Sequence, residues 1–347
     1  MKQVNLTGKN ILFYDDCGKE SIMVRIPKFL VSDVIEGGPD EVHPAFIVNG
    51  KEKECIYVSK YQNVVENERA YSLPGKDPAV LYSIEEADTF CRNKGTGWHL
   101  MTGAEWAAVA LWSQKNGTVP RGNNLKGKDW SRPHEHGTVI SLDAVVPKGE
   151  QGPPMRIATG SGPDSWSHDG TCEGIFDLNG NIWEMTSGLR LRDGTVEIVE
   201  NNDAALFSLE ECTWRHILQK DASLTSCQSE VLQMTGQTSE NEKTTIRFLQ
   251  EDDTKKQNSF FLGTFSETTA QIEKDSIGNL MQQYCLIPTC SEPYSDATWC
   301  VTEGIRYPIR GGYWVNEEKA GIFAYGFYMQ PDDRYFDVGF RCCYIDD

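Results

Sequence analysis

The sequence predicts the α+β fold class, with two helices, short strands and much ordered loop in a single domain covering residues 1–347. Two segments carry a capping box, in which a hydroxyl and a carboxylate three residues later satisfy each other's backbone amides: Ser83 with Glu86, and Thr102 with Glu105. Short runs of β-branched and aromatic residues, bounded by Gly, Pro, Asn and Asp, predict strands around them. Capped helices with short strands and aromatic-containing loops favour α+β over a parallel doubly wound sheet.

The N-terminal strands are expected at 11–14 and 22–26, where apolar runs end at Asp, Gly or Pro. The runs 43–48 and 55–61 flank Asn49-Gly50, so we expect them to pair as a hairpin.

The two helices are expected to run from Ile84 to Lys94 and from Gly103 to Asn116, because Gly95 and Gly117 follow as terminators. Each has an apolar stripe at helical spacing, which predicts that it covers one face of a sheet.

Residues 117–170 lose regular periodicity and are expected to form ordered loops, pinned to the core by Trp130 and Trp166. Residues 195–300 are expected to be an insertion within the domain, with strands at 245–249 and 260–263.

Composition excludes several functional classes. The net charge of −18 argues against nucleic-acid binding, which needs a basic face. There is no apolar run of the length that spans a membrane, so no membrane insertion is expected. The first residues lack the apolar core of a signal peptide, which predicts synthesis in a bacterial cytoplasm.

The eleven cysteines are scattered, with no C-x-x-C pair, and the six histidines lack zinc-finger spacing. We therefore expect no structural zinc site and mostly reduced, buried thiols. One disulfide among Cys285, Cys290 and Cys300 is the alternative.

The C-terminal region, residues 310–343, combines two sets of residues. The first set has the character of a fixed frame and comprises Arg310, Gly311, Gly312, Trp314, 320–323 and 339–341. The second set comprises Tyr313, Val315, Asn316, Tyr325, Gly326, Phe327, Tyr328, Asp332, Asp333, Arg334, Tyr335, Phe336 and Asp337. Tyr and Phe among Gly, Asn and Asp are typical of antibody combining sites, so the second set predicts a binding surface. The alternative is a strand pair with an aromatic-lined loop.

Four motifs carry a resemblance to a known superfamily. They are WHLMTGAEW at 98–106, GIFDLNGNIWE at 174–184, RGGYW at 310–314 and GFRC at 339–342. In this order they resemble the formylglycine-generating-enzyme, or sulfatase-modifying-factor, superfamily, which has a C-type-lectin-like fold. The resemblance implies that fold for this chain. It also implies a structural calcium site with Asp177, Asn179 and Glu184 as candidate ligands; the alternative is that Asn179 makes a turn and Glu184 pairs with an arginine.

One branch of that superfamily resembles the chain more closely, the variable proteins of diversity-generating retroelements. HPAF at 43–46, PRGNN at 120–124, GSGP at 160–163, SGLR at 187–190 and NNDAA at 201–205 resemble gut-phage members of this branch. In such systems template adenines are randomised, and an AAC or AAT codon can never become Lys, Glu, Gln, Met or Trp. All thirteen residues of the second set satisfy this constraint.

The enzymes of the superfamily differ from this chain at their metal ligands. Formylglycine-generating enzymes hold copper with two cysteines just after the RGG motif, where this chain has Tyr313, Val315 and Asn316. There is no cysteine between Cys300 and Cys342, and no histidine after His216 for an iron site. We therefore expect a binding protein without a cofactor, with an oxidoreductase of the same superfamily as the alternative.

The expected function is receptor recognition: a hypervariable surface, carried on a phage particle, that binds a protein or glycan on a bacterial cell surface. If so, the frame residues Trp314, Phe323 and Phe340 should be buried. The rings of Tyr325, Tyr328, Tyr335 and Phe336 should be exposed. A purely structural module predicts instead that these rings are buried.

Overall fold

The computed structural model describes residues 3–5, 10–140, 155–238, 244–249 and 260–346, and the structural statements below concern these residues. The architecture is mixed α+β, built mostly of strands and loops, which confirms the expected class. The helices are α1 (Val31–Val34), α2 (Ile84–Arg92), α3 (Gly103–Lys115) and α4 (Leu280–Gln283).

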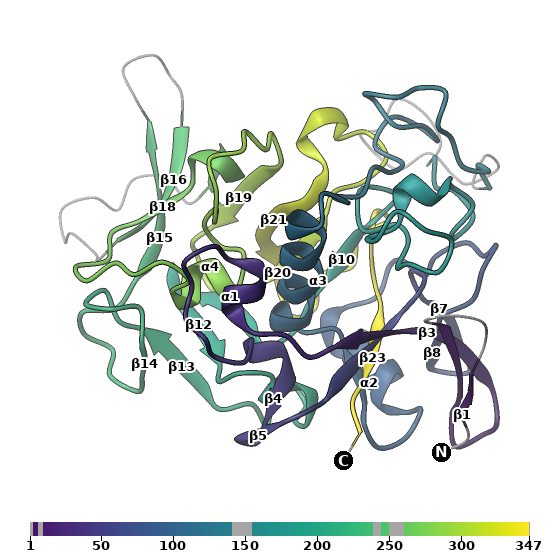
Figure 1. Ribbon diagram of the computed structural model, residues 1–347, viewed down its shortest axis with the longest axis horizontal. Helices are drawn as coiled ribbons and strands as arrows, with labels where there is room; N and C mark the ends of the chain where they lie inside the picture. Colours follow the sequence, from purple (N-terminus) through teal and green to yellow (C-terminus); the bar gives the residue numbers. More distant parts are fainter. Residues whose placement is uncertain (1–2, 6–9, 141–154, 239–243, 250–259, 347) are drawn as a thin grey trace.

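Helix α3 runs through the middle of the molecule (Figure 1). Its capping box is present as predicted, with Thr102 accepting from the amide of Glu105 at 3.1 Å and Glu105 accepting from the amide of Thr102 at 2.9 Å. Every residue from Gly103 to Leu111 is buried. The expectation that α3 covers a sheet with one apolar face is therefore wrong: alanines on its remaining faces allow close packing on all sides.

The larger of the two main sheets has thirteen strands, and its main path has the spatial order β17-β19-β21-β20-β11-β12-β15-β16-β18. Along that path the strands are β17 (Phe260–Thr264), β19 (Ala297–Val301), β21 (Gly321–Met329), β20 (Ile305–Gly311), β11 (Leu189–Arg192), β12 (Thr195–Val199), β15 (Gln233–Thr238), β16 (Thr244–Leu249) and β18 (Thr269–Ala270). The other four are β10 (Trp183–Met185), β13 (Trp214–Ile217), β14 (Leu224–Thr225) and β22 (Val338–Phe340).

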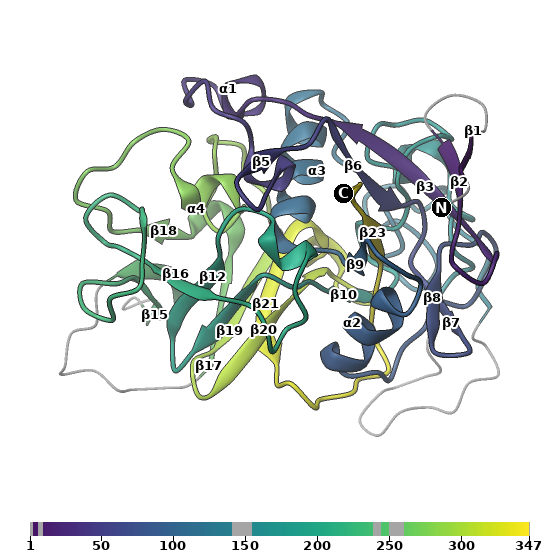
Figure 2. The same cartoon turned by 90° about the horizontal axis from the view of Figure 1, so that it is seen from below.

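The smaller main sheet has six strands in the order β1-β2-β3-β6-β23-β9. They are β1 (Gln3–Asn5), β2 (Asn10–Tyr14), β3 (Glu20–Pro27), β6 (Cys55–Ser59), β23 (Cys342–Tyr344) and β9 (Trp98–Leu100). Two hairpins complete the strands: β4 (Ile47–Val48) with β5 (Lys51–Glu52), and β7 (Val64–Glu66) with β8 (Arg69–Tyr71). In Figure 2 the two main sheets lie on opposite sides of α3.

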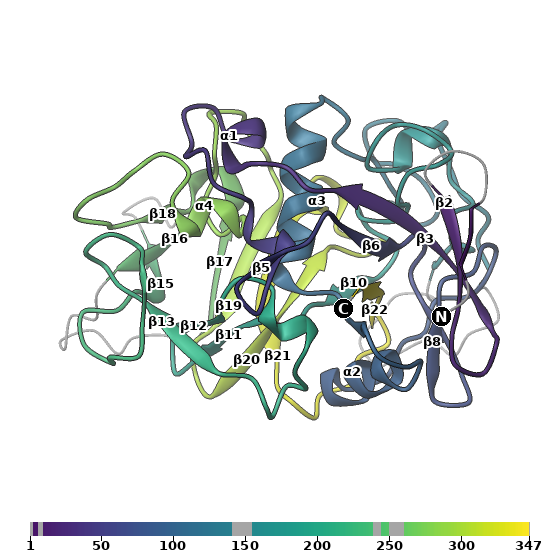
Figure 3. The ribbon, with the colours of Figure 1, turned by 60° about the horizontal axis from the view of Figure 1, so that its bottom comes forward.

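The predicted hairpin between 43–48 and 55–61 is wrong in its pairing. Pro44–Phe46 forms a 3-10 turn, β4 pairs with β5, and β6 lies between β3 and β23. Pro44 lacks an amide hydrogen for a sheet and fits the first turn of a helix, which explains the break. This turn and α1 both come from the N-terminal part of the chain, and both pack against α3 (Figure 3).

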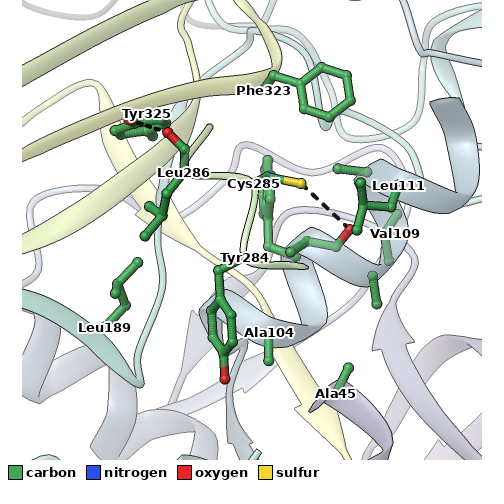
Figure 4. Packing of buried hydrophobic residues seen from close by; sticks show 14 of the residues in the cluster. Ala45, Ala104, Val109, Leu111, Leu189, Tyr284, Cys285, Leu286, Phe323 and Tyr325 are labelled. Atoms are coloured by element: carbon green, nitrogen blue, oxygen red, sulfur yellow. Dashed lines mark hydrogen bonds between the residues drawn. The ribbon is translucent and has the colours of Figure 1, made fainter. Parts of the chain in front are cut away.

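Residues 195–300 supply strands to the larger sheet and side chains to its core. β12 pairs with β11, and β19 pairs with β21. Tyr284, Cys285 and Leu286 pack between α3 and β21, and the Cys285 thiol lies 3.9 Å from the carbonyl of Ala107 (Figure 4). The segment is therefore packed into the main core, and the expected strands at 245–249 and 260–263 are present as β16 and β17.

The loop tryptophans behave differently from each other. Trp166 is buried and its indole donates to Glu135 at 2.9 Å, as expected for a ring that pins a loop. Trp130 is 44% exposed, so it does not play that part.

All eleven cysteines are free thiols here, including Cys285, Cys290 and Cys300. Among the described helices, none has the length and apolar character needed to cross a membrane.

Candidate binding surface

The C-terminal region is built on four strands of the larger sheet, β10, β20, β21 and β22. β20 lies beside β21, with Arg310 opposite Tyr325 and Ile309 opposite Gly326. β10 pairs with both β20 and β22 and so joins the two ends of the region. The loops 312–320 and 330–337 leave from this frame.

The frame residues expected to be buried are buried: Trp314, Phe323 and Phe340 are each at most 2% exposed.

Two arginines of the C-terminal region, Arg310 and Arg341, are also fully buried. Arg341 donates to both oxygens of Glu184 at 2.5 Å and to the carbonyls of Ser59 and Phe176. Arg310 has no carboxylate partner among the described contacts and donates instead to the carbonyls of Tyr284 and Cys285, at 3.2 and 3.4 Å. These bonds join the C-terminal region to three distant parts of the chain.

The two glycines of the RGG motif are required by the turn that leaves β20. Gly311 and Gly312 have φ values of +92° and +88°, which residues with a side chain rarely adopt. A Cβ on Gly312 would lie 2.5 Å from the Cβ of Ala320. The motif therefore serves the backbone of the frame.

Three of the thirteen predicted surface residues are core residues. Tyr325, Gly326 and Phe327 are buried, and their predicted exposure is wrong. The reason is their position in β21, which is hydrogen-bonded on both edges by β19 and β20. The ring of Tyr325 points inward and its hydroxyl donates to the carbonyl of Leu286 at 2.9 Å (Figure 4). Gly326 lies beneath the ring of Trp299, which a Cβ would meet at 3.1 Å.

The other ten predicted residues lie at least partly exposed, in the two loops and at the end of β21. They are Tyr313, Val315, Asn316, Tyr328, Asp332, Asp333, Arg334, Tyr335, Phe336 and Asp337. These ten residues form the rim surface.

One aromatic pair of the rim surface is held by the loop 330–337. The rings of Tyr328 and Tyr335 lie 5.5 Å apart between centroids. Asp333 accepts from the amide of Gln330 at 2.9 Å and from the hydroxyl of Tyr335 at 3.2 Å, which closes the loop and positions the second ring. Burial is the main cause that raises the pKa of Tyr335, so its hydroxyl stays protonated and can donate.

A second aromatic group involves the loop 312–320. Tyr313 packs on the buried Trp314 at 5.0 Å, and Trp314 lies 5.8 Å from Phe336 of the other loop. Asn316 accepts from the amide of Tyr313 at 2.9 Å. The buried ring of Trp314 thus supports two half-buried rings, one from each loop, and restricts their motion.

The polar edge of the rim surface is tied to α2. Arg334 donates to Glu86 at 3.0 Å, and Glu86 also accepts from the amide of Ser83 in the capping box at 2.8 Å. The hydrogen bond from Arg334, followed by that from the Ser83 backbone, lowers the pKa of Glu86. The pair is exposed, so it orients Arg334 more than it stabilises the fold.

Two residues beside the rim surface were not predicted from the sequence. Trp299 of β19 is half-buried, packs edge-on against Trp183 at 4.9 Å and covers Gly326. Leu81 is 55% exposed, and its amide donates to the carbonyl of Tyr335 at 3.0 Å. The contact between Trp299 and Gly326 depends on the pairing of β19 with β21, so it could not be recognised from the sequence alone.

The three candidate calcium ligands do not fit a calcium site as they stand. Both oxygens of Glu184 face Arg341, and the side-chain oxygen of Asn179 accepts from Asn124 at 3.2 Å. Asp177 has one oxygen bonded to the amide of Gly160 and one without a hydrogen-bond partner, and burial raises its pKa to about 6. The arrangement favours the alternative in which Glu184 pairs with an arginine. Calcium binding stays a prediction that a metal assay would test.

Comparisons with known proteins give only distant matches. No family model matches the chain, and no curated protein matches it. Among solved structures, PvdO from Pseudomonas aeruginosa matches with a TM-score of 0.36 and 12% identity, over 96% of this chain and 98% of that one. Treponema denticola variable protein 1 matches with a TM-score of 0.35 and 10% identity, over 98% of this chain and 100% of that one. Both TM-scores are below 0.5.

Proposed function

We propose that this protein is a ligand-binding protein whose rim surface is diversified and recognises a protein or glycan on a bacterial cell surface. The observation that carries the proposal is the grouping of Tyr313, Tyr328, Tyr335 and Phe336, all half-buried, on buried frame residues. Grouped, partly exposed rings are enriched in binding sites, because each offers a large contact area at low entropic cost.

The proposal includes a C-type-lectin-like fold and the retroelement type of variation, both supported by the motif resemblance in the sequence. It also includes a role without catalysis, supported by Tyr313, Val315 and Asn316 standing where the related enzymes hold copper. An oxygen-consumption assay on the purified protein tests that part. Carriage on a phage particle is tested by looking for the protein in purified virions.

The burial of three of the thirteen predicted residues indicates which codons should vary and which should not. If the codons of residues 310–343 are sequenced across many copies of the gene, variation should concentrate on the rim surface. Tyr325, Gly326 and Phe327 should stay constant because they are core residues. An adenine-rich near-repeat and a reverse-transcriptase gene should lie close to the 3′ end. Equal variation at buried and rim positions would contradict the proposal, as would no variation at all.

Binding is tested with matched surface variants. Changing Tyr328, Tyr335 and Phe336 together to Ser should abolish adhesion of the labelled protein to a host bacterium. The control is Ile277→Ser, since Ile277 is 60% exposed and contacts Gly37, away from the C-terminal region. Equal adhesion by both variants would mean that the rim surface is not the binding site.

A further inference from the structure

A second constellation of reactive side chains lies apart from the rim surface, where the smaller sheet meets α3. Cys343 of β23 stands directly opposite His99 of β9 in the antiparallel register, so both side chains lie on one face of the sheet. Glu105, in the first turn of α3, faces them. All three residues are fully buried, and one ligand atom from each lies within 4.8 Å of the others.

The hydrogen bond of His99 to Gly97 means that its other ring nitrogen and Glu105 must share a cation, either a proton or a metal ion. Its Nδ1 lies 3.0 Å from the carbonyl oxygen of Gly97, which can only accept, so Nδ1 carries the hydrogen. Its Nε2 lies 2.9 Å from Oε1 of Glu105. In a neutral imidazole this nitrogen and the carboxylate would face each other with lone pairs. Either a second proton or a metal ion must therefore lie between them.

The surroundings of these side chains resemble the outer shell of a metal site. A histidine that binds a metal usually donates its other ring N–H to a carbonyl or carboxylate, as His99 does to Gly97. The ligating carboxylate is itself usually hydrogen-bonded, and Glu105 accepts from the amide of Thr102 at 2.9 Å and from Asn202 at 3.0 Å.

We propose that His99, Glu105 and Cys343 bind a zinc ion. An imidazole, a carboxylate and a thiolate are the three donor types that zinc accepts together, whereas calcium and magnesium require oxygen. The ion takes the place of the proton between His99 and Glu105, and the Cys343 thiol gives up its proton to solvent on binding. A water completes the tetrahedron. Donor atoms around zinc lie about 3.5 Å apart, so Nε2 of His99 and Oε1 of Glu105, now 2.9 Å apart, must separate by about 0.5 Å, while Sγ of Cys343 already lies within 4.8 Å of both.

The ligands are scattered at positions 99, 105 and 343, which is why spacing in the sequence gave no zinc motif. The ion joins β9, β23 and α3, three segments that the chain brings together only in the folded state. Zinc binding should therefore stabilise the fold without touching the rim surface.

The first test uses the full-length wild-type protein. The protein is unfolded in a denaturant that contains a chelator and is then refolded in the presence of either zinc or chelator. Unbound metal is removed by desalting. We expect one zinc per chain by elemental analysis and a higher melting temperature for the zinc-refolded sample. Refolding with cobalt should give a thiolate-to-cobalt charge-transfer band. No bound zinc, no cobalt band and equal melting temperatures would show that a proton lies between His99 and Glu105, and would overturn the proposal.

The second test assigns the site. Cys343→Ser and His99→Gln should each lose the zinc. Cys17→Ser is the matched control, because Cys17 lies in a different cluster with Asp15 and Asp16 and is exposed. Zinc that persists in Cys343→Ser and disappears in Cys17→Ser would overturn the assignment. If Cys343→Ser does not fold, the wild-type cobalt band still decides whether a thiolate is a ligand.

Discussion

Strand β21 and the loop 330–337 that follows it share a composition but have opposite environments. Tyr325 in the strand is fully buried, whereas Tyr335 in the loop is half-buried and packs on Tyr328. The difference comes from the neighbours of each backbone. β21 has strands on both edges and Leu286 behind it, while the loop is held by the side chain of Asp333. Aromatic composition alone therefore does not show whether a ring is buried; the position of its backbone relative to the sheet decides that.

The largest expected effect comes from the same substitution made in both regions. Tyr325→Ser removes a buried ring and should lower the free energy of unfolding by about 3–5 kcal/mol. It also leaves the carbonyl of Leu286 without its donor. Tyr335→Ser should cost about 1 kcal/mol or less. Urea denaturation of the two variants measures the difference, and equal losses would show that the loop ring is also core.

The next largest effect is the pH dependence supplied by Asp296, which supports the start of β21. It accepts from the amide of Phe323 at 2.9 Å, and burial raises its pKa from 3.8 to about 7. As pH rises from 3.8 to about 7, the unfolded chain releases this proton and the folded chain keeps it, so stability falls. The loss above pH 7 is up to about 4 kcal/mol.

Asp296→Asn mimics the protonated form and should therefore melt higher than wild type at pH 8, with the gain disappearing near pH 4. Melting curves across this range test the idea, and the exposed Asp332→Asn is the control. A gain that is independent of pH would show that it does not come from titration of Asp296.

A smaller effect tests the contact between Gly326 and Trp299. A Cβ at position 326 would lie 3.1 Å from the indole, so Gly326→Ala should cost about 1–3 kcal/mol through overpacking. In the background of Trp299→Ala the same change should be nearly neutral. A double-mutant cycle measures this coupling. Additive costs would mean that the strand conformation, and not the ring, requires glycine.

The smallest effect is expected at the exposed pair Arg334 and Glu86. Arg334→Ala should leave the melting temperature unchanged within error, because exposed ion pairs contribute little. It should nevertheless alter partner binding if the rim surface recognises a ligand. The matched change is Arg341→Ala at the buried ion pair with Glu184, which should strongly destabilise the fold.

The sequence predicted the features that depend on local chemistry. Both capping boxes, the burial of Trp314, Phe323 and Phe340, and the strands at 245–249 and 260–263 are confirmed. Each of these features can be predicted from residues that lie close together in the sequence.

The features that depend on pairing between distant segments were not predicted. The burial of Tyr325 follows from β19 on one edge of β21 and β20 on the other. The burial of α3 from Gly103 to Leu111 follows from elements packed on all of its sides, and the proximity of His99 and Cys343 follows from a strand register. The residue pattern within one segment does not specify which other segment packs against it.

The position of β23 has a consequence for how the protein is made. This strand lies between β6 and β9, with Cys343 opposite Val58 and His99, so residues late in the chain complete a sheet begun at its start. The smaller sheet cannot close until translation has passed residue 344 in the correct reading frame. A frameshift or stop codon within residues 310–341 would remove β23, which would leave β9 without its strand partner and β6 paired only with β3. If the C-terminal region is diversified as proposed, folding itself would select chains whose reading frame is intact.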